Sequence, residues 1–239
     1  MSGSLLKIGC CGFPVPKIKY AERFSVGEVQ QTFYQPPQIS TLQRWRTLVP
    51  NDFEFTLKAW QLITHEARSP TYRRLKTKLS ATELEQCGSF KFTPPVVRAW
   101  EVSRDCAEAL RARHLLFQCP ASFTPSEANL AQMRHFFNAI DRHELILFWE
   151  PRGAWPAELV QSLCAELNLI HAVDPFVTTT TSSEFIYFRL HGGKGFKHIY
   201  SSEELQTLKA LLPAGRPAYV LFNNINMWTD ASRFSSLFA

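Results

Sequence analysis

The stretch FIYFRLHGGKG, residues 185–195, changes abruptly from an apolar run to charged and glycine positions. The β-branched and aromatic residues at its start are typical of a buried strand. Side chains two apart in a strand leave on the same face, so Arg189 and His191 are expected to point the same way, together with Tyr187. The glycines that follow let the backbone approach a ligand closely. The segment predicts an anion site with Lys194 on the glycine loop, and the alternative is a strand that meets solvent before a glycine turn.

Further apolar runs predict strands along the whole chain. With the first stretch, they place strands at residues 5–11, 28–34, 53–59, 114–119, 145–150, 170–174, 185–191 and 218–223. Helical patterns lie between most of them, with start signals at Ser40 or Thr41, Thr93-Pro94, Thr124-Pro125-Ser126, Pro156 and Ser201. Eight strands that alternate with helices predict an α/β fold, namely a single (β/α)8 TIM-type barrel over residues 1–239.

Two connections depart from an ideal barrel. Residues 175–183, between the sixth and seventh predicted strands, are rich in threonine and serine and carry no helical pattern, so we expect a missing or degenerate helix there. The connection between the third and fourth strands, about residues 60–113, is long and contains a basic run from Arg68 to Lys78. One interpretation of this run is a solvated loop, and the other is a lid over an anionic ligand.

Composition limits the class of protein and its partners. The formal charge of +5 suits a small anionic or phosphorylated ligand and leaves nucleic acid open as a partner without requiring it. No apolar run approaches the roughly 18 residues of a membrane-spanning helix, so no membrane partner is expected. The six cysteines lack paired zinc spacing and fit reduced core thiols, which favours a cytoplasmic protein. The oligomeric state stays open.

Polar residues close nearly every predicted strand. In α/β barrels, ligand sites form at the carboxyl ends of the strands, so these residues are expected to converge. The predicted catalytic residues are Glu150, Asp174 and His191, and the predicted ligand-binding residues are Glu28, Tyr34, Lys58, His65, Gln118, Arg152, Trp155, Arg189, Lys194 and Asn223.

Alternation also predicts polar side chains inside the barrel. Glu28 is expected to share one face of the second strand with Gln30, Thr32 and Tyr34. A buried carboxylate needs a cationic or hydrogen-bonding partner, and Lys58 on the neighbouring strand is the candidate. The alternative is an internal polar network that only fixes the register of the strands.

A set of short motifs extends over almost the whole chain. They are EVQQTFY from Glu28, FEFTLK from Phe53, FQCPASF from Phe117, WEPR from Trp149, Asp174-Pro175, RLHG from Arg189 and FNN from Phe222. Together they resemble the YecE-like family, known as domain of unknown function seventy-two. The resemblance implies a single TIM-type barrel without an established reaction, comparable with metal-dependent endonuclease barrels at the level of the fold alone. The chain departs from the common pattern at Gln30, where asparagine is usual, and at Cys119.

Three functions fit these residues. The first is an enzyme that binds, and hydrolyses, an anionic or phosphorylated ligand at the carboxyl end of the barrel. In that function, cationic residues hold the anion, a carboxylate is the general base and His191 donates or accepts a proton. The cationic residues are Lys58, Arg152, Arg189 and Lys194, and the candidate bases are Glu150 and Asp174.

The two other functions differ in chemistry. A metal-dependent, nuclease-like hydrolase would draw its ligands from His65, Glu150, Asp174 and His191, although no HxH or HExxH spacing is present, so the cofactor stays undetermined and no metal ligand is assigned. The last function is a non-catalytic barrel that binds a ligand or a protein, in which Trp155 either stacks over a ligand or packs in the core.

Overall fold

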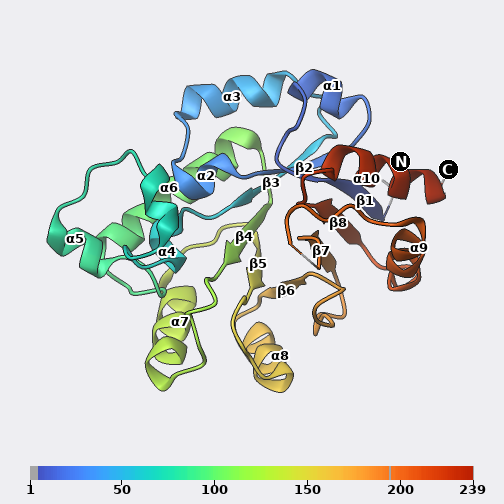
Figure 1. Cartoon of the computed structure of the whole chain (residues 1–239). Helices are drawn as coiled ribbons and strands as arrows, with labels where there is room; N and C mark the ends of the chain where they lie inside the picture. Colours follow the sequence, from blue (N-terminus) through green and yellow to red (C-terminus); the bar gives the residue numbers. More distant parts are fainter. Residues whose placement is uncertain (1–4, 194, 239) are drawn as a thin grey trace.

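The computed structural model describes residues 5–193 and 195–238 and contains a closed barrel of parallel strands. The strands are β1 (Leu6–Cys11), β2 (Val26–Val29), β3 (Glu54–Lys58), β4 (His114–Gln118), β5 (Ile146–Glu150), β6 (Ile170–Val173), β7 (Ile186–Leu190) and β8 (Ala218–Phe222). Each strand pairs with the next, and β1 pairs with β8 to close the ring, which Figure 1 shows at the centre of the molecule. The predicted (β/α)8 barrel is confirmed.

Helices surround this ring (Figure 1). They are α1 (Lys17–Ala21), α2 (Gln31–Tyr34), α3 (Ile39–Thr47), α4 (Gln61–Thr64), α5 (Ala81–Gln86), α6 (Pro94–Leu110), α7 (Glu127–Ala139), α8 (Ala157–Glu166), α9 (Ser202–Ala210) and α10 (Met227–Ser235), with the 3-10 turns η1 (Pro70–Arg74) and η2 (Ser236–Phe238). Across residues 5–193 and 195–238, none of the helices combines the length and the apolar character needed to cross a membrane.

Most helix starts lie where the sequence predicts them. The Ser126 side chain accepts a hydrogen bond from the backbone N–H of Asn129 at 3.2 Å, and Ser201 forms a capping box with Glu204. The predicted start of α3 at Ser40 or Thr41 is wrong. That helix begins at Ile39, because extended backbone at Gln38 turns directly into it without a side-chain cap.

Each strand is buried on both faces, and the two faces differ in chemistry. Outward side chains such as Phe55 and Phe117 pack against the helices, whereas inward side chains such as Leu116, Phe148 and Tyr187 pack against one another. Toward the carboxyl ends of the strands, the inward side chains are polar or charged instead. They include Glu28, Lys58, Gln118, Glu150 and Arg189. The barrel therefore has an apolar interior that becomes polar toward the carboxyl ends of its strands.

The second strand corrects one prediction. Only Val26–Val29 are extended, and Gln31–Tyr34 form the short helix α2. The polar and apolar residues after Glu28 alternate as in a strand, but the helical turn buries Thr32 and Phe33 together, and the Thr32 hydroxyl donates to the carbonyl oxygen of Lys58 at 2.7 Å. Gln30, Thr32 and Tyr34 thus do not continue the strand face that carries Glu28.

The two irregular connections have different structures. In the described part of the chain, β7 follows β6 with no helix between them. The connection from β3 to β4 holds α4, η1, α5 and α6, and its basic run is attached to the end of α2. There the Gln35 side-chain oxygen accepts from the backbone N–H groups of Lys76 at 2.9 Å and Thr77 at 3.0 Å.

Candidate functional site

The centre of the site is an ion cluster formed by Arg189, Glu28 and Glu150. Arg189 donates from Nε and Nη2 to the two carboxylate oxygens of Glu28, at 3.0 Å and 2.6 Å, and from Nη1 to Glu150. The Arg189 and Glu28 side chains are 0% exposed, and that of Glu150 is 3% exposed. Three strands that are distant in sequence, β2, β5 and β7, are therefore joined inside the barrel by charge-assisted hydrogen bonds.

Glu28 is saturated with donors. Besides Arg189, it accepts from the Tyr187 hydroxyl at 2.9 Å and from the Gln30 side-chain amide. The Thr56 hydroxyl lies 2.9 Å from that of Tyr187 and completes the network, since Tyr187 donates to Glu28 and can accept from Thr56. The predicted partnership of Glu28 with Lys58 is wrong. The prediction rested on the adjacency of the two strands. In the structure, Arg189 extends across the interior of the barrel and donates to both carboxylate oxygens of Glu28.

Glu150 also has a full set of partners. Its Oε1 accepts from Gln118 at 2.9 Å, Arg152 at 3.0 Å and His191 at 2.8 Å, and its Oε2 accepts from Arg189. Burial alone would raise the pKa of this carboxyl group, but the charge of Arg189 and the hydrogen bond from His191 hold it well below its usual range. Glu150 is therefore ionised and orients the groups around it.

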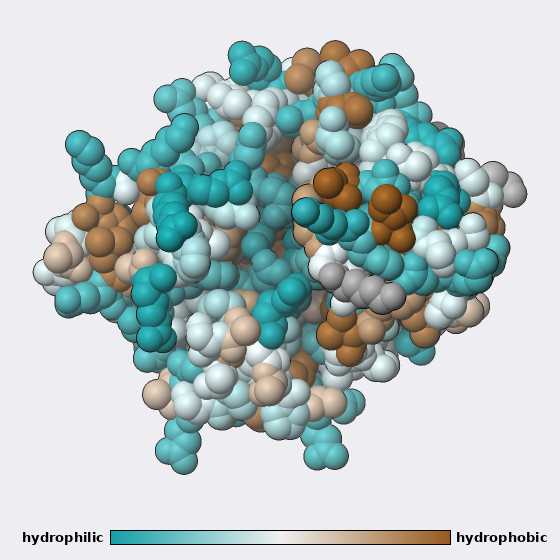
Figure 2. All heavy atoms as spheres, viewed as in Figure 1, coloured by the Kyte–Doolittle hydropathy of each residue, from teal (hydrophilic) through white to brown (hydrophobic). Residues whose placement is uncertain are grey.

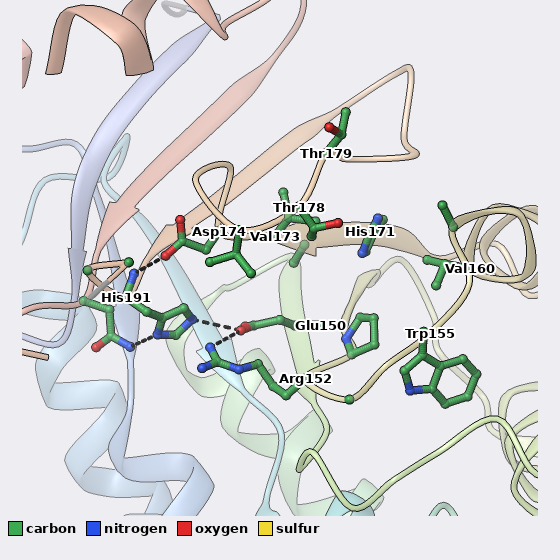
Figure 3. A pocket seen from close by; sticks show the side chains of 18 of the residues that line it. Glu150, Arg152, Trp155, Val160, His171, Val173, Asp174, Thr178, Thr179 and His191 are labelled. Atoms are coloured by element: carbon green, nitrogen blue, oxygen red, sulfur yellow. Dashed lines mark hydrogen bonds and ion pairs between the residues drawn. The ribbon is translucent and has the colours of Figure 1, made fainter. Parts of the chain in front are cut away.

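His191 connects this network to solvent. The Asn223 amide nitrogen lies 3.0 Å from Nδ1. Two groups lie near Nε2, namely Glu150 Oε1 at 2.8 Å and Arg189 Nη1 at 3.3 Å, and the shorter contact, with Glu150, is the hydrogen bond that Nε2 makes. An amide nitrogen only donates and a carboxylate only accepts, so Nδ1 carries the lone pair and Nε2 carries the hydrogen. Figure 3 shows His191, Glu150 and Arg152 joined in this way. The ring thus presents a proton acceptor on the side away from Glu150.

The loop after β7 brings the backbone close to the ring. Gly192 has a φ of +72°, and a Cβ there would lie 2.6 Å from the carbonyl oxygen of Gly195, so only glycine fits. The N–H of Gly192 donates to the Tyr200 hydroxyl at 2.8 Å, and the N–H of His191 donates to Asp174 at 2.9 Å. Asp174 therefore positions the backbone of His191. Lys194, predicted to bind the ligand, lies outside the described residues.

A cavity of about 550 Å³ lies beside His191 at the carboxyl ends of β5 to β8, and we call it the mouth cavity. Six predicted residues line it, which are Glu150, Arg152, Trp155, Asp174, His191 and Asn223. Figure 3 shows several of them around the opening, and Figure 2 shows a hollow with hydrophilic residues near the centre of the barrel face. Trp155 lines the cavity, and its ring also packs edge-on against that of Trp149, with the ring centroids 4.9 Å apart.

Lys58 lies outside the lining of the mouth cavity but is connected to it. Its ammonium nitrogen donates to the Gln118 side-chain oxygen and lies 3.4 Å from the centre of the Phe33 ring. Gln118 in turn donates to Glu150 at 2.9 Å. Burial, and secondly the charge of Arg189, lower the pKa of Lys58 from 10.5 to about 7.

Tyr34 and His65 lie on the Lys58 side of the barrel. The guanidinium of Arg74, in the basic run, lies 3.6 Å from the centre of the Tyr34 ring. His65 is 7% exposed and its Nδ1 lies 2.8 Å from the Thr64 hydroxyl. Burial, and then the charge of Lys58, lower the pKa of His65 to about 3, so this imidazole is neutral over most of the pH range. Neither residue is among those that line the mouth cavity.

The site contains residues that are not among the predicted site residues. Tyr187, expected on the same strand face as Arg189, and Thr56, two residues before Lys58, complete the Glu28 network. His171 and Phe196 also line the mouth cavity. His171 lies within β6 and Phe196 lies in the loop after β7, and no pattern in the sequence marks either one.

The residues proposed for a metal site do not come together as a ligand set. Among the described residues, no group of three or more histidine, cysteine, aspartate or glutamate side chains is arranged to hold a metal ion. Both buried carboxylates of the interior, Glu28 and Glu150, are directed at the guanidinium of Arg189. A cation already occupies the position between them.

Comparison with known proteins places the chain in a family. The profile described as "Protein of unknown function DUF72" matches residues 18–238. A DUF72 family protein from Enterococcus faecalis V583 is 20% identical, with a TM-score of 0.73 over 98% of this chain and 97% of the other. A second DUF72 family protein, from Thermotoga maritima MSB8, is 21% identical, with a TM-score of 0.63 over 98% of both chains.

A further structure shares the fold alone. A xylose isomerase domain containing protein from Salmonella typhimurium LT2 is 14% identical, with a TM-score of 0.58 over 96% of this chain and 94% of the other. None of the curated proteins matches the chain. With the profile covering residues 18–238, the chain belongs to the family of proteins of unknown function DUF72.

Proposed function

We propose that the protein is an enzyme that binds a small anionic ligand in the mouth cavity and transfers a proton through His191. The observation that carries this proposal is the pairing of His191 with an ionised, buried Glu150 on one side and with Asn223 at the cavity on the other. A carboxylate that fixes the tautomer of an imidazole is a recurring arrangement for general base catalysis.

The group that accepts the proton can be identified from the hydrogen bonds that Glu150, Asp174 and His191 already make and from the lowered pKa of Glu150. Glu150 accepts from four donors and has a lowered pKa, so it is a weak base at neutral pH. Asp174 accepts backbone hydrogen bonds from Phe176 at 3.1 Å and His191 at 2.9 Å. The Nδ1 atom of His191 has only the Asn223 amide on it, and a ligand hydroxyl can replace that partner. His191 is therefore the proton acceptor, and Glu150 and Asp174 are positioning residues.

The anionic part of the ligand is assigned to Arg152. Its side chain is 42% exposed and lines the mouth cavity, and Nη1 donates to Glu150 at 3.0 Å. The remaining N–H groups have no partner among the described residues, and a guanidinium fork matches the oxygen spacing of a phosphate or carboxylate. Arg189, by contrast, is fully buried, and its N–H groups donate to Glu28 and Glu150. We therefore assign Arg189 to holding these two carboxylates in place and not to binding the ligand.

Hydrolysis is one reaction open to such a base, with water as the molecule that loses a proton to His191. A metal-dependent hydrolase is less well supported, because the described residues provide no cluster of metal ligands. The basic run after α4 is our candidate for the lid, since Arg74 covers the Tyr34 ring beside the barrel. Six buried, unpaired cysteines support a reducing, cytoplasmic setting for this enzyme.

A thermal-shift titration tests the proposal. The probes are inorganic phosphate, sugar phosphates, nucleotides and short oligonucleotides, each with and without divalent ions. Binding to the folded state alone adds about 2.7 kcal/mol at a hundredfold excess over Kd, which is a clear shift in Tm. We expect a phosphate-bearing probe to stabilise the protein without a metal ion. His191→Asn should keep this shift while turnover of the same probe is lost.

Arg152→Ala is the decisive variant, and Arg134→Ala is its matched control. Arg134 is a partly exposed arginine on α7 whose partner is Glu166, with Nε 2.7 Å from Oε1, and it is not among the residues that line the mouth cavity, so its removal changes the charge by the same amount outside the site. The shift should disappear in Arg152→Ala and persist in Arg134→Ala. A shift that needs a divalent ion would support the metal hydrolase, and a panel without any shift would contradict ligand binding.

A further inference from the structure

Lys58 is a buried amine for which the proposed proton transfer has no use. It is the last residue of β3 and is 4% exposed, at the polar end of the barrel interior. Through Gln118 it is connected to Glu150 Oε1, the atom that also accepts from His191. An amine at this position therefore belongs to the same network as the proposed base.

The surroundings of Lys58 fit an amine better than an ammonium group. An ammonium has three N–H donors to satisfy, and in the described part of the chain Gln118 is the one hydrogen-bond acceptor that Nζ has. The Phe33 ring, whose centre lies 3.4 Å from Nζ, gives an ammonium a cation–π contact but supplies no acceptor oxygen for its remaining N–H groups. The nearby carboxylates are engaged by Arg189, whose positive charge further disfavours a second cation. Burial and Arg189 accordingly lower the pKa of Lys58 to about 7.

We infer that Lys58 is a nucleophile that forms an imine with a carbonyl group of the ligand, an inference that rests on the function proposed above. The substrates of the site are then aldehydes or ketones that carry an anionic group, such as phosphorylated sugars with an open-chain carbonyl. Lysine residues act in this way where burial and a neighbouring cation keep them uncharged. The anion would lie on Arg152, and the carbonyl would turn toward β3.

The chemistry balances without another reactant. The lone pair of Nζ attacks the carbonyl carbon, a C–N bond forms, and a proton moves from nitrogen to oxygen to give a carbinolamine. Loss of water then produces the C=N bond, and a proton from solvent converts it into the iminium. This cation acidifies the C–H bond beside it, and His191 Nδ1 is the base available to remove that proton. The site would thus suit isomerisation or C–C bond cleavage next to a carbonyl.

Borohydride trapping tests the inference on the intact protein. Wild-type protein is incubated at neutral pH with dihydroxyacetone phosphate, and separately with dihydroxyacetone, and then treated with sodium borohydride, which reduces an imine to a stable amine. Peptide mass spectrometry locates the adduct. With dihydroxyacetone phosphate, we expect at least about ten-fold more adduct on Lys58 than on any other lysine, because an ordinary lysine amine, with a pKa of about 10.4, is almost entirely protonated at neutral pH.

A second measurement needs no ligand. Competitive acetylation of all lysines across a pH series reports the protonation of each amine, and Lys58 should react with a midpoint near 7, below the roughly 10.4 of a model lysine amine. Lys209, an exposed residue on α9, is an internal reference. Lys58→Met removes the nucleophile without adding a charge, and the adduct should be absent from it.

Each result has a separate meaning. An adduct on Lys58 in wild type and in His191→Asn supports imine formation before proton transfer. An adduct with dihydroxyacetone but not with its phosphate would support the nucleophile and contradict the proposed anion site. A phosphate-dependent thermal shift without any adduct, or an acetylation midpoint for Lys58 equal to that of Lys209, would overturn the imine and leave the anion-binding function standing.

Discussion

The guanidinium of Arg189 and the carboxylate of Glu28 face each other as two parallel forks, with N–O distances of 3.0 Å and 2.6 Å, and both side chains are fully buried. This geometry offsets part of the cost of removing two charges from water. Because Glu150 binds the same guanidinium, the loss of Arg189 would leave two carboxylates without their main partner. The three side chains of the interior ion cluster therefore depend on one another for their stability.

Replacement of Arg189 is expected to destabilise the fold severely. Arg189→Met should lower the free energy of unfolding by about 3–5 kcal/mol, since buried charges lose their partner. Urea denaturation at neutral pH measures this loss. Arg134→Met, which breaks the exposed pair with Glu166, should leave the midpoint close to wild type. Similar losses in the two variants would contradict the role of the interior cluster.

Acid should remove the stabilisation that Glu150 provides. Its folded pKa lies well below the ordinary 4.5, so the unfolded state binds more protons in acid and stability falls as the pH drops below 4.5. Above that value the contribution is complete. The difference in unfolding free energy between wild type and Glu150→Gln should therefore be largest near neutral pH and shrink in acid. A difference that stays constant down to low pH would refute the assigned ionisation.

Lys58 should make the stability of the fold rise with pH in the alkaline range. Its folded pKa of about 7 lies below the ordinary 10.5, so the full cost of burying the ammonium is present below 7. Between these values the unfolded state binds more protons, and stability should rise by at most about 1.4 kcal/mol per pH unit. Lys58→Met should lack this rise. Chemical denaturation of both proteins across this range measures it, and parallel curves would contradict the lowered pKa.

The Tyr187 hydroxyl should matter to stability through Glu28. Tyr187→Phe removes a donor to the carboxylate at 2.9 Å and the group that accepts from Thr56, so we expect a loss of about 1–3 kcal/mol. Tyr219→Phe is a matched control inside the same barrel, because its hydroxyl lies 3.5 Å from His114 Nδ1 and makes a weaker contact. Thermal or urea unfolding of the two variants should separate them clearly.

The tautomer of His191 can be observed directly. With Asn223 donating to Nδ1 and Glu150 accepting from Nε2, the ¹⁵N NMR spectrum of histidine-labelled protein should show a pyridine-type Nδ1 and a pyrrole-type Nε2 for this ring. Comparison with His191→Asn assigns the signals. In Asn223→Ala the tautomer should persist, since Glu150 still fixes Nε2–H. A protonated Nδ1 in the wild type would remove it as the proton acceptor.

Most of the barrel is readable from the sequence because parallel strands buried on both sides form continuous apolar runs. The observed strand β5, Ile146–Glu150, starts one residue inside its predicted range, and β8 ends one residue earlier than predicted. The second strand fails for a physical reason. The polar and apolar residues after Glu28 alternate as in a strand, but in the structure they form a single helical turn that buries Thr32 and Phe33. Periodicity over so few residues cannot distinguish a strand from a helical turn.

The site is readable as residue types but less so as pairings. Ligands of α/β barrels bind at the carboxyl ends of the strands, and this rule predicted Glu150, Arg189 and His191 at the ends of β5 and β7. In the structure, Glu150 contacts both of the other residues. The partner of Glu28 was mispredicted because adjacency of strands is visible in a sequence, whereas reach across the barrel interior depends on closure and side-chain length. Arg189 spans that gap, and Lys58 turns to Gln118 instead.

The ion cluster also has a consequence for how the chain acquires its structure. Glu28 and Arg189 are separated by 161 residues, and Glu150 and Arg189 by 39. During synthesis from the N-terminus, β1 to β6 emerge before the residue that neutralises their carboxylates, so a partial barrel carries charges that resist drying of its interior. Contacts of such long range are slow to form. Exclusion of water from the interior therefore has to wait for β7, which brings Arg189, and for β8, which closes the ring. A nascent chain that stops short of Arg189 is expected to remain open to proteases and chaperones.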